Sequence, residues 1–425
     1  MPDTTLPVLI AGAGPVGCFV AYRLGRAGIL VRVFEKESDL PYTPRAVGYY
    51  GATQTVLQES GLYDLVRSEG FVTAGLCWRT PPVPNSSGGK SLGRMIAKQP
   101  LCAPGDEVRA CPSGLLNLRQ SELTKLLLRE ALATGKVTVD YNSEVTSIEQ
   151  SSNSVTVSLN GTSDSTIIGS YLVGADGDKS AVRKILATPC LGHTWPERLI
   201  STDVELLNDV DPIYHTVYII GLKNYTIMTP LTPPVLGERS LWRCTIAVPP
   251  EDTRSDDELS RDEVILGFYE EVVAGPRPLA ATIRARSVYR IHQRLVPTMR
   301  KGRCVLAGDA AHLNNPYGAM GLNTGLLDGD ALAEALIMIL QEGKSDELLT
   351  VYSDARRKVF QTFVDPTTTA NKLRLHAPDP AAAAYDDEYF RSMQDPTAEV
   401  LADAARPYFE TWRTDMKALA QGAGL

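Results

Sequence analysis

Two glycine-rich segments of this chain have the residue types and spacing of sites that hold phosphate groups. The first, Gly12-Ala13-Gly14-Pro15-Val16-Gly17, lies between an apolar run at residues 8–11 and a helical pattern. A second apolar run, residues 31–34, ends at Glu35 and Lys36. In a strand–turn–helix–strand unit such glycines form the turn and admit a pyrophosphate, while the acid accepts from ribose hydroxyls. The residues expected at this dinucleotide seat are Gly12, Gly14, Pro15, Gly17, Glu35 and Lys36.

The second segment begins where an apolar run, residues 304–307, stops at Gly308-Asp309, and a glycine loop then leads into a helical pattern at residues 326–340. A strand, a glycine loop and a helix N-terminus together present backbone N–H groups and a positive dipole end to an anionic group. Asp309 is placed to accept from a ribitol or ribose hydroxyl, and Gly318 and Gly321 would let the backbone lie flat against a planar ring. This segment is therefore predicted to be a second cofactor seat.

Other candidate residues lie between these two segments. Arg45 stands in a loop shortly after Glu35, where a planar guanidinium would match phosphate oxygens. Arg119 and Gln120 stand near the start of a helical pattern at residues 115–133. A third apolar strand ends at Gly174-Ala175-Asp176-Gly177. By itself this segment could be a strand that ends in a turn, and it indicates a cofactor site only together with the other two motifs.

Composition and charge limit the classes of function. The 425 residues are 44% hydrophobic and 22% charged, which is typical of a globular protein of two domains. The net charge of −8 and the absence of a lysine–arginine stripe argue against nucleic-acid binding. The first strand is expected by residue 7 and no long apolar stretch follows, so we expect no signal peptide, no membrane span and a cytoplasmic location. The seven cysteines are scattered, which favours neither a disulfide framework nor a metal site.

The helices and strands that would position these residues are predicted to form an α/β unit in the first part of the chain. Helices are expected at residues 53–67 and 115–133, and residues 78–112, rich in proline, glycine and serine, are expected to be an exposed connection. Short strands, predicted to form a small meander beside the nucleotide unit, are expected at residues 137–139, 145–148, 155–159 and 166–170.

Residues 190–290 have a different pattern, with apolar or alternating runs separated by proline, glycine and asparagine. This is typical of an antiparallel sheet, and we expect it to face the cofactor as a second domain. The expected elements are strands at residues 201–206, 215–221, 225–231, 241–248 and 281–292, and a helix at residues 256–274. Beyond residue 340 the chain is predicted to be a helical packing segment.

The three motifs in this order, together with Gly318-Ala319-Met320-Gly321-Leu322-Asn323, resemble the single-component FAD-dependent aromatic hydroxylases of the p-hydroxybenzoate hydroxylase class. The resemblance covers roughly residues 7–345 and is weakest through residues 190–290. It implies a Rossmann-like FAD-binding domain, an antiparallel substrate domain and a helical tail. The implied division is residues 1–75, 113–189 and 291–345 for FAD, residues 76–112 and 190–290 for substrate, and residues 346–425 for the tail.

The resemblance also implies roles for single residues at the nucleotide end. Gly12, Gly14 and Gly17 would seat the FAD pyrophosphate, with Arg45 beside it and Glu35 on the adenosine ribose.

At the flavin end, Asp309 would hold the ribitol, and Asp176 matches a motif that serves both FAD and the nicotinamide cofactor. Either Arg119 or Gln120 matches a flavin-contacting position, and the sequence leaves this choice open.

The glycine loop would meet the pyrimidine edge of the flavin through Gly318, Gly321, Leu322 and Asn323, where a helix N-terminus favours the negative charge of reduced flavin. Pro316 matches a proline whose carbonyl faces the substrate in relatives. The implied reaction uses NADPH or NADH and O2 to insert one oxygen atom into a small molecule through a flavin C4a-hydroperoxide.

The substrate is the least defined part. In benzoate-hydroxylating relatives a sheet strand supplies an arginine for the substrate carboxylate, but residues 225–231 contain none. We therefore expect a neutral or phenolic, fairly apolar ring of polyketide, quinone or terpenoid type. His312 is expected to support its loop, and no general base is assigned. Candidate pocket residues are His215, Tyr218, Tyr225 and Met228, although core packing is the favoured explanation for these four. Arg243, for which a surface strand position is favoured, and Pro316 are further candidates.

Other outcomes of the same cofactor chemistry remain open at this point, namely epoxidation, Baeyer–Villiger oxidation, or a flavin-dependent reductase without oxygen insertion. A flavin-dependent halogenase is disfavoured because the W-x-W-x-I-P pattern is absent. The sequence indicates neither NADPH over NADH nor an oligomeric state.

Overall fold

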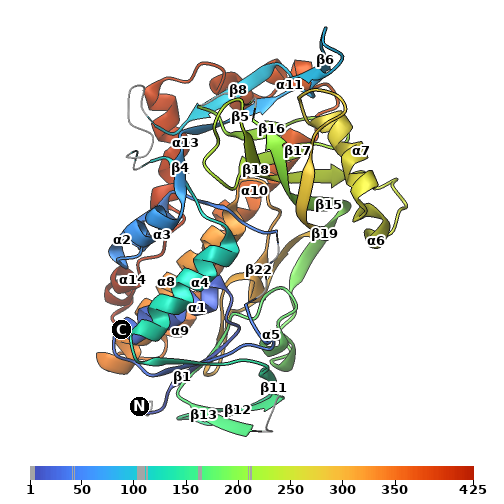
Figure 1. Ribbon diagram of the computed structural model, residues 1–425. Coiled ribbons are helices and arrows are strands. Elements are labelled where there is room, and N and C mark those ends of the chain that lie inside the picture. The colour runs from blue at the N-terminus through green and yellow to red at the C-terminus, as the bar shows by residue number, and fades with distance from the viewer. Residues whose placement is uncertain are drawn as a thin grey trace.

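The computed structural model describes residues 5–40, 42, 44–102, 111, 113–160, 165–208, 210 and 213–425. Two large sheets organise the chain, one at each end of the long axis in Figure 1. The first sheet is six-stranded, in the order β10 (Val137–Asp140), β2 (Val31–Phe34), β1 (Val8–Ala11), β14 (Leu172–Gly174), β21 (Cys304–Leu306) and β20 (Arg300–Lys301). All its neighbours are parallel except β20 and β21. The α/β class is therefore confirmed.

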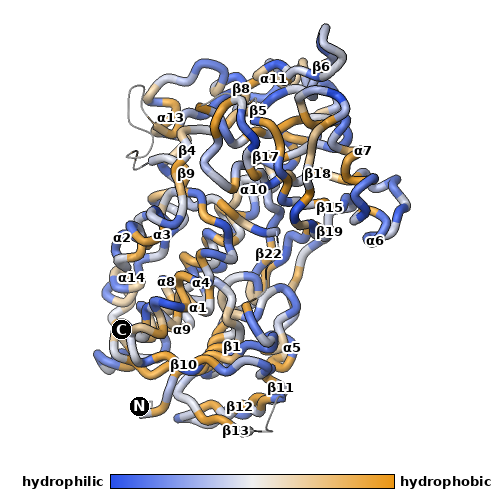
Figure 2. Tube along the Cα trace, viewed as in Figure 1, coloured by the Kyte–Doolittle hydropathy of each residue, from blue (hydrophilic) through white to orange (hydrophobic). Residues whose placement is uncertain are grey.

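The first motif forms as the sequence predicts. Strand β1 is wholly buried, which is what a parallel strand covered on both faces requires. The chain turns at Gly12, whose φ of 99° favours glycine. Helix α1 (Pro15–Arg26) follows, and the fixed φ of Pro15 suits its first turn. The long helix α8 (Met320–Gln341) packs against α1, and the hydrophobic segments of Figure 2 converge on β1, α1 and α8.

Several elements around this sheet differ from the prediction. Strand β10 was expected in the meander, but it pairs in parallel with β2 at the edge of the main sheet. The meander itself contains β11 (Glu144–Gln150), β12 (Val155–Asn160) and β13 (Ser165–Gly169). The short strand β9 (Leu115–Asn117) precedes helix α4 (Gln120–Ala133), so the helix predicted over residues 115–133 begins later.

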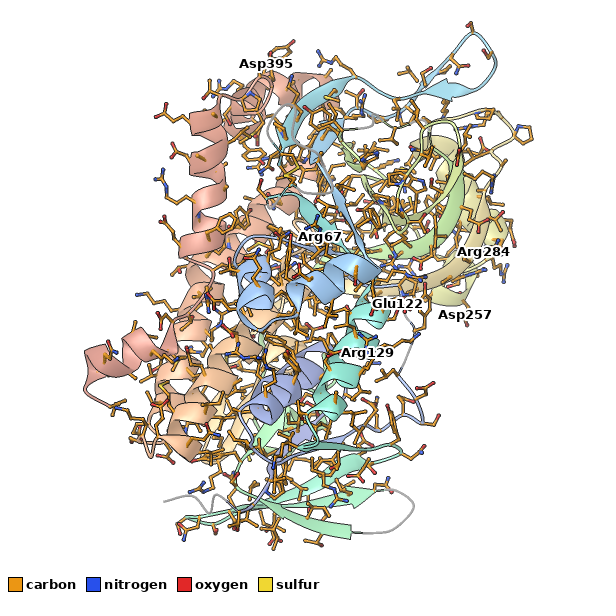
Figure 3. The ribbon with its side chains drawn as sticks, turned by 60° about the vertical axis from the view of Figure 1, so that its left-hand side comes forward. Arg67, Glu122, Arg129, Asp257, Arg284 and Asp395 are labelled. Atoms are coloured by element: carbon orange, nitrogen blue, oxygen red, sulfur yellow. A yellow bond between two sulfur atoms is a disulfide. The ribbon has the colours of Figure 1, made fainter. Side chains whose placement is uncertain are left out.

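The helix predicted over residues 53–67 is divided. Helix α2 (Ala52–Glu59) ends before Gly61, whose φ is 76°, and α3 (Tyr63–Glu69) follows. The turn at Gly61 explains the break, since a left-handed residue cannot continue a right-handed helix. Strand β9 pairs with β3 (Gly48–Tyr49) and β4 (Phe71–Thr73). On the outward face of α4, Arg129 Nη1 lies 3.0 Å from Glu69 Oε1, and Arg129 and Glu122 are labelled in Figure 3.

The second sheet is eight-stranded and mostly antiparallel. Its order is β22 (His312–Leu313), β19 (Thr282–Leu295), β15 (Leu191–Leu207), β18 (Arg239–Val248), β17 (Thr226–Pro230), β16 (Thr216–Ile219), β5 (Gly75–Arg79) and β8 (Met95–Pro100). Helices α6 (Asp256–Leu259) and α7 (Asp262–Val272) replace the single helix predicted over residues 256–274, and α7 covers a core on one face.

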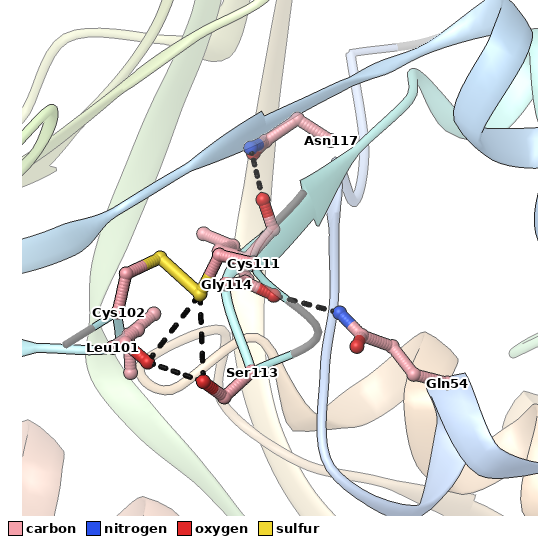
Figure 4. The surroundings of a disulfide bond; sticks show 8 residues. Gln54, Leu101, Cys102, Cys111, Ser113, Gly114 and Asn117 are labelled. Atoms are coloured by element: carbon pink, nitrogen blue, oxygen red, sulfur yellow. Dashed lines mark hydrogen bonds between the residues drawn. A yellow bond between two sulfur atoms is a disulfide. The ribbon is translucent and has the colours of Figure 1, made fainter. Parts of the chain in front are cut away.

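Strands β5 and β8 show that residues 78–112 are not simply an exposed connection, as was predicted. They extend the second sheet, and β5 pairs in parallel with β16. The proline- and glycine-rich part between them forms a small hairpin, β6 (Val83–Pro84) with β7 (Lys90–Ser91). The cysteine prediction was also wrong, because Cys102 and Cys111 form a disulfide beside Ser113 (Figure 4).

The C-terminal part is helical, as predicted. It runs from the first sheet to the second and back (Figure 1). Its helices are α9 (Leu348–Val359), the π-turn η3 (Phe360–Val364), α10 (Asp365–Leu375), α11 (Pro380–Asp386), α12 (Glu388–Ser392), α13 (Ala398–Glu410) and α14 (Met416–Ala423). None of the helices in the described residues is long and apolar enough to cross a bilayer.

Candidate active site

A single continuous cavity of about 1360 Å³ connects the two sheets. Small-molecule pockets commonly occupy roughly 300–1,000 Å³, so this one has room for a dinucleotide and a second molecule. One end is bordered by the loops of the first sheet, and the other by the face of the second sheet and the C-terminal helices. The predicted residues that border it are Gly12, Gly14, Pro15, Glu35, Lys36, Arg45, Gln120, Asp176, Tyr218, Arg243, Asp309, Pro316, Gly318, Gly321 and Leu322.

The nucleotide end is built around Glu35. Its Oε2 accepts from the backbone N–H of Ala13 at 2.9 Å, and its Oε1 accepts from that of Glu37 at 3.0 Å. A Cβ on Gly12 would lie 2.5 Å from the carbonyl oxygen of Ala175, so the two motifs approach too closely for any side chain there. Gly17 lies beneath the turn, where a Cβ would strike the carbonyl of Gly12, and it allows close packing without bordering the cavity.

Asp176 uses its carboxylate to organise its own motif. Oδ1 accepts from the Ser180 hydroxyl at 2.5 Å and Oδ2 from the Val182 N–H at 3.0 Å, at the start of α5 (Ala181–Ile185). Arg183 Nη1 then donates to the carbonyl of Ala310 at 3.0 Å. These contacts connect the motif at residues 174–177 with the loop that contains Asp309.

Asp309 and Arg45 both border the cavity, and the charge of Arg45 acts on the carboxylate of Asp309. The side chain of Asp309 opens onto the cavity, and because protein surrounds that space, burial raises its pKa while the charge of Arg45 opposes the shift. The guanidinium of Arg45 lies 5.2 Å from the centre of the Tyr289 ring. This pairing of an acceptor and a cation suits a ligand with hydroxyl and phosphate groups.

Arg243 is a buried residue rather than a surface strand arginine. Its Nε lies 2.5 Å from Asp203 Oδ1, and its Nη1 donates to the carbonyl of Arg45. It borders the cavity while fixing the loop that contains Arg45.

The structure separates Arg119 from Gln120. Gln120 borders the cavity, whereas Arg119 is the residue before α4, with Nη2 3.9 Å from Glu122 Oε1, and does not border it. Of the two candidates, Gln120 is therefore the one that borders the cavity.

The loop at residues 316–323 is held from two sides. Ala319 has a φ of 54° and Gly318 a φ of 106°, and α8 starts directly afterwards with its N-terminus at the cavity. Tyr50 Oη donates to the carbonyl of Gly318. Asn323 is buried and donates to the carbonyls of Gly48 at 2.9 Å and Ala319 at 2.7 Å, so it supports the loop and does not border the cavity.

A buried network lies behind this loop. His312 Nε2 lies 2.6 Å from Asp328 Oδ2, and Arg356 Nε donates to Asp328 Oδ1 at 2.6 Å. Arg356 Nη1 continues to the carbonyl of Trp412 at 2.7 Å, which connects the loop to the C-terminal helices. The structural role expected for His312 agrees with this arrangement.

Three predicted pocket residues do not border the cavity. Met228 belongs to the core on the opposite face of the sheet, since its neighbours Ile227 and Thr229 face the cavity. Tyr225 donates to Glu197 Oε1 at 2.5 Å inside the protein. His215 precedes β16 and also lies outside the lining.

Sequence reasoning missed the contribution of the C-terminal helices. Tyr50, Trp78 and Tyr218 border the far end of the cavity, and helices α10, α12 and α13 close it. Trp78 stacks on Tyr218 with ring centres 5.5 Å apart. Of the three aromatic residues, only Tyr218 was named as a candidate from the sequence, and no motif marked Tyr50, Trp78 or the lining residues of the C-terminal helices. The lining residues from these helices include Asn371, Arg374, Tyr389, Leu401, Ala404, Ala405 and Tyr408.

The residues at the nucleotide end fit a flavin dinucleotide, since a turn that admits no side chain, an α1 N-terminus and a carboxylate lie on one surface. A family model described as an FAD binding domain matches residues 5–367. The chain belongs to this family. It is an FAD-dependent monooxygenase of the aromatic hydroxylase type with NAD(P)H as reductant, which confirms the predicted family, cofactors and reaction class.

Two curated relatives are similar along most of their length. Para-nitrophenol 4-monooxygenase of Pseudomonas sp. (strain WBC-3) is 32% identical over 399 residues, which is 92% of each chain. The 6-hydroxy-3-succinoylpyridine 3-monooxygenase HspB of Pseudomonas putida (strain DSM 28022 / S16) is 32% identical over 384 residues, 89% of this chain and 91% of that one.

A solved structure has the same fold. The p-nitrophenol 4-monooxygenase PnpA from Pseudomonas putida DLL-E4 superposes with a TM-score of 0.83 and 30% identity over 95% of this chain and 97% of that one.

Proposed function

We propose that the protein hydroxylates a one-ring phenol, with NAD(P)H as the electron source and O2 as the oxygen source. The observation that carries this proposal is the aromatic chamber, by which we mean the cavity end bordered by Tyr50, Trp78, Tyr218, Tyr389 and Tyr408. It lies beside Gly318, in the loop proposed to meet the flavin.

The chamber offers flat walls and neutral hydrogen-bond donors. Burial raises the pKa of Tyr218 to about 12, against the opposing effect of the Gly318 backbone, so its hydroxyl stays protonated at neutral pH. Burial likewise raises the pKa of Tyr408 to about 12. A phenol ring fits between such walls, since aromatic pairs with ring centres roughly 4.5–7 Å apart attract each other.

We assign the cofactor roles accordingly. When bound, FAD supplies electron transfer from NAD(P)H and the activation of oxygen. Gly12, Gly14 and Glu35 would hold the nucleotide half, and Arg45 and Asp309 its centre. Residues 316–322 and Gln120 would surround the flavin ring, while the N-terminus of α8 would stabilise negative charge at its pyrimidine edge.

The chain's own residues also keep water from the reacting ring. Helix α13 has no buried residue of its own, yet it turns Leu401, Ala404, Ala405 and Tyr408 toward the cavity. This apolar face closes the chamber. It keeps out water, which would otherwise promote breakdown of the activated oxygen species before it reacts with the substrate.

The experiment uses FAD-loaded protein with 4-nitrophenol, 4-ethylphenol, 4-hydroxybenzoate and a four-ring polyketide under 18O2. We expect a one-ring phenol to stimulate NAD(P)H oxidation and to gain one labelled oxygen atom. Unlabelled product, or stimulation accompanied only by hydrogen peroxide, would contradict the proposal. Selective turnover of the four-ring substrate would leave oxygen insertion standing and contradict the one-ring substrate.

A further inference from the structure

We propose that Arg374 binds a planar two-oxygen substituent, a nitro or carboxylate group, on the ring of the substrate. The inference rests on the proposed function and names the substrate class more closely. Arg374 lies on α10, beyond the residues 5–367 that the family model matches. It revises the expectation of a neutral substrate, which depended on the absence of arginine from residues 225–231.

Three contacts fix the guanidinium of Arg374. Its Nε lies 3.2 and 3.1 Å from Oδ1 and Oδ2 of Asp387, and its Nη1 donates to Asn371 Oδ1 at 3.0 Å. The guanidinium carbon lies 4.3 Å from the centre of the Tyr389 ring. A cation held in this way loses little side-chain entropy when it binds a ligand.

These contacts leave donor capacity on the guanidinium of Arg374. Within the described residues no protein group accepts a hydrogen bond from Arg374 Nη2. The side chain of Arg374 is 15% exposed. Arg374 borders the cavity, whereas its ion-pair partner Asp387 does not. A ligand in the cavity would therefore meet the arginine and not the carboxylate. The planar fork of an arginine matches two oxygen atoms in one plane.

The surroundings of Arg374 favour an electron-rich group. Among the residues that the structure describes, the acidic ones that border the cavity lie at the nucleotide end, namely Glu35, Glu144, Asp176, Asp178 and Asp309. Near Arg374 the lining offers the hydroxyls of Tyr389 and Tyr408, and burial raises the pKa of both although the charge of Arg374 opposes the shift. Neutral donors and one cation therefore meet the ligand at this end.

Arg374 also lies near the loop that is proposed to meet the flavin. Asn371, its hydrogen-bond partner, donates to the carbonyl of Tyr317 at 3.3 Å. A Cβ on Gly318 would lie 2.8 Å from Asn371 Nδ2. Two hydrogen bonds through Asn371 thus connect the guanidinium of Arg374 to the loop proposed to meet the flavin.

The test measures binding apart from turnover. FAD-loaded wild type and Arg374→Leu are titrated with 4-nitrophenol, 4-hydroxybenzoate and 4-ethylphenol, and the change in flavin absorbance gives each Kd. A hydrogen bond to a charged group contributes about 1.5–3 kcal/mol. We therefore expect the Kd of 4-nitrophenol or 4-hydroxybenzoate to rise about tenfold to a hundredfold, and that of 4-ethylphenol to change less than about threefold. Whichever of the first two shows the rise identifies the substituent.

Two further variants control for structure. Arg391→Leu removes an exposed arginine from α12, outside the lining, and should leave all three Kd values unchanged. Asp387→Asn keeps an acceptor at the start of α12 and removes the ion pair, so the selectivity should persist. If Arg374→Leu fails to hold FAD, Arg374→Lys takes its place, and the same ligand-selective rise is expected at a smaller size, at least about threefold.

The outcomes are distinguishable. Equal weakening of all three ligands, no weakening, or tighter wild-type binding of 4-ethylphenol than of both other phenols would overturn the role of Arg374. A selective loss of binding in a protein that transfers no oxygen would support Arg374 as the anchor and defeat the proposed function.

Discussion

Oδ2 of Asp328 lies 2.6 Å from Nε2 of His312, and both side chains are buried. The same carboxylate oxygen accepts from the N–H of Gly308 at 3.1 Å, and the other oxygen pairs with Arg356. One aspartate on α8 therefore joins the loop of the second cofactor seat to helix α9. We regard this network as the reason that the loop keeps its shape.

Asp328→Ala should destabilise the protein strongly. It leaves Arg356 buried and without its carboxylate, and breaking such a pair costs about 3–5 kcal/mol. Chemical denaturation of both proteins measures the difference. The control is Asp354→Ala, which removes an exposed carboxylate 3.7 Å from Arg357 and should cause no measurable change. Similar stabilities of Asp328→Ala and the control would show that the network contributes little.

The same carboxylate should make stability depend on pH in acid. Burial by itself raises the pKa of Asp328, but the charges of His312 and Arg356 hold it below its usual value of 3.8. A lowered folded-state pKa means that the stabilisation is present above the unfolded pKa and is lost as the pH falls through the folded one. The difference in unfolding free energy between wild type and Asp328→Asn should therefore shrink between about pH 5 and pH 3. A difference that stays constant over this range would contradict the assignment.

Gly12→Ala should lose FAD. The added Cβ would meet the carbonyl of Ala175, and a φ of 99° is strained for alanine. Such strain costs about 1–3 kcal/mol, which corresponds to about a tenfold to hundredfold weaker affinity. Flavin content after purification and an FAD titration measure the effect. Gly267→Ala, in open space on helix α7, is the control and should keep its flavin.

Ala405→Phe should block the aromatic chamber without disturbing the nucleotide end. Ala405 borders the cavity from α13, and extra carbon atoms in a packed site cost about 1–3 kcal/mol. We expect the KM for the phenol to rise about tenfold or more while the FAD affinity stays within a factor of two. Asp403→Phe places the same ring on the exposed side of α13 and should leave the KM unchanged. An unchanged KM in Ala405→Phe would remove α13 from the chamber.

The nucleotide end was predictable because its chemistry is encoded locally. A turn that needs Gly12 and an acid at the end of the next strand appear as a pattern in sequence. The roles of Arg119 and Gln120 were not decidable in this way. Adjacent residues at a helix start point in different directions, and only the packed position of α4 shows which one faces the cavity.

Of the chamber end only Tyr218 was predicted, since the rest depends on how distant elements pack together. Tyr218, Arg374 and Tyr408 come from a strand and two tail helices, and nothing in their local sequence indicates that they meet. The misplacement of β10 has a related cause, because a four-residue strand carries no information about its partner. Cys102 and Cys111 were discounted because the seven cysteines are scattered, odd in number and without a C-x-x-C pair.

The position of a bound phenol shows whether the cavity is used as we propose. A crystal structure of the FAD-loaded protein with 4-nitrophenol is the decisive measurement. We predict the flavin ring against residues 316–322 and the phenol ring between Tyr218 and Tyr389, with its nitro group on Arg374. A flavin seated elsewhere, or a phenol bound outside this chamber, would contradict the account.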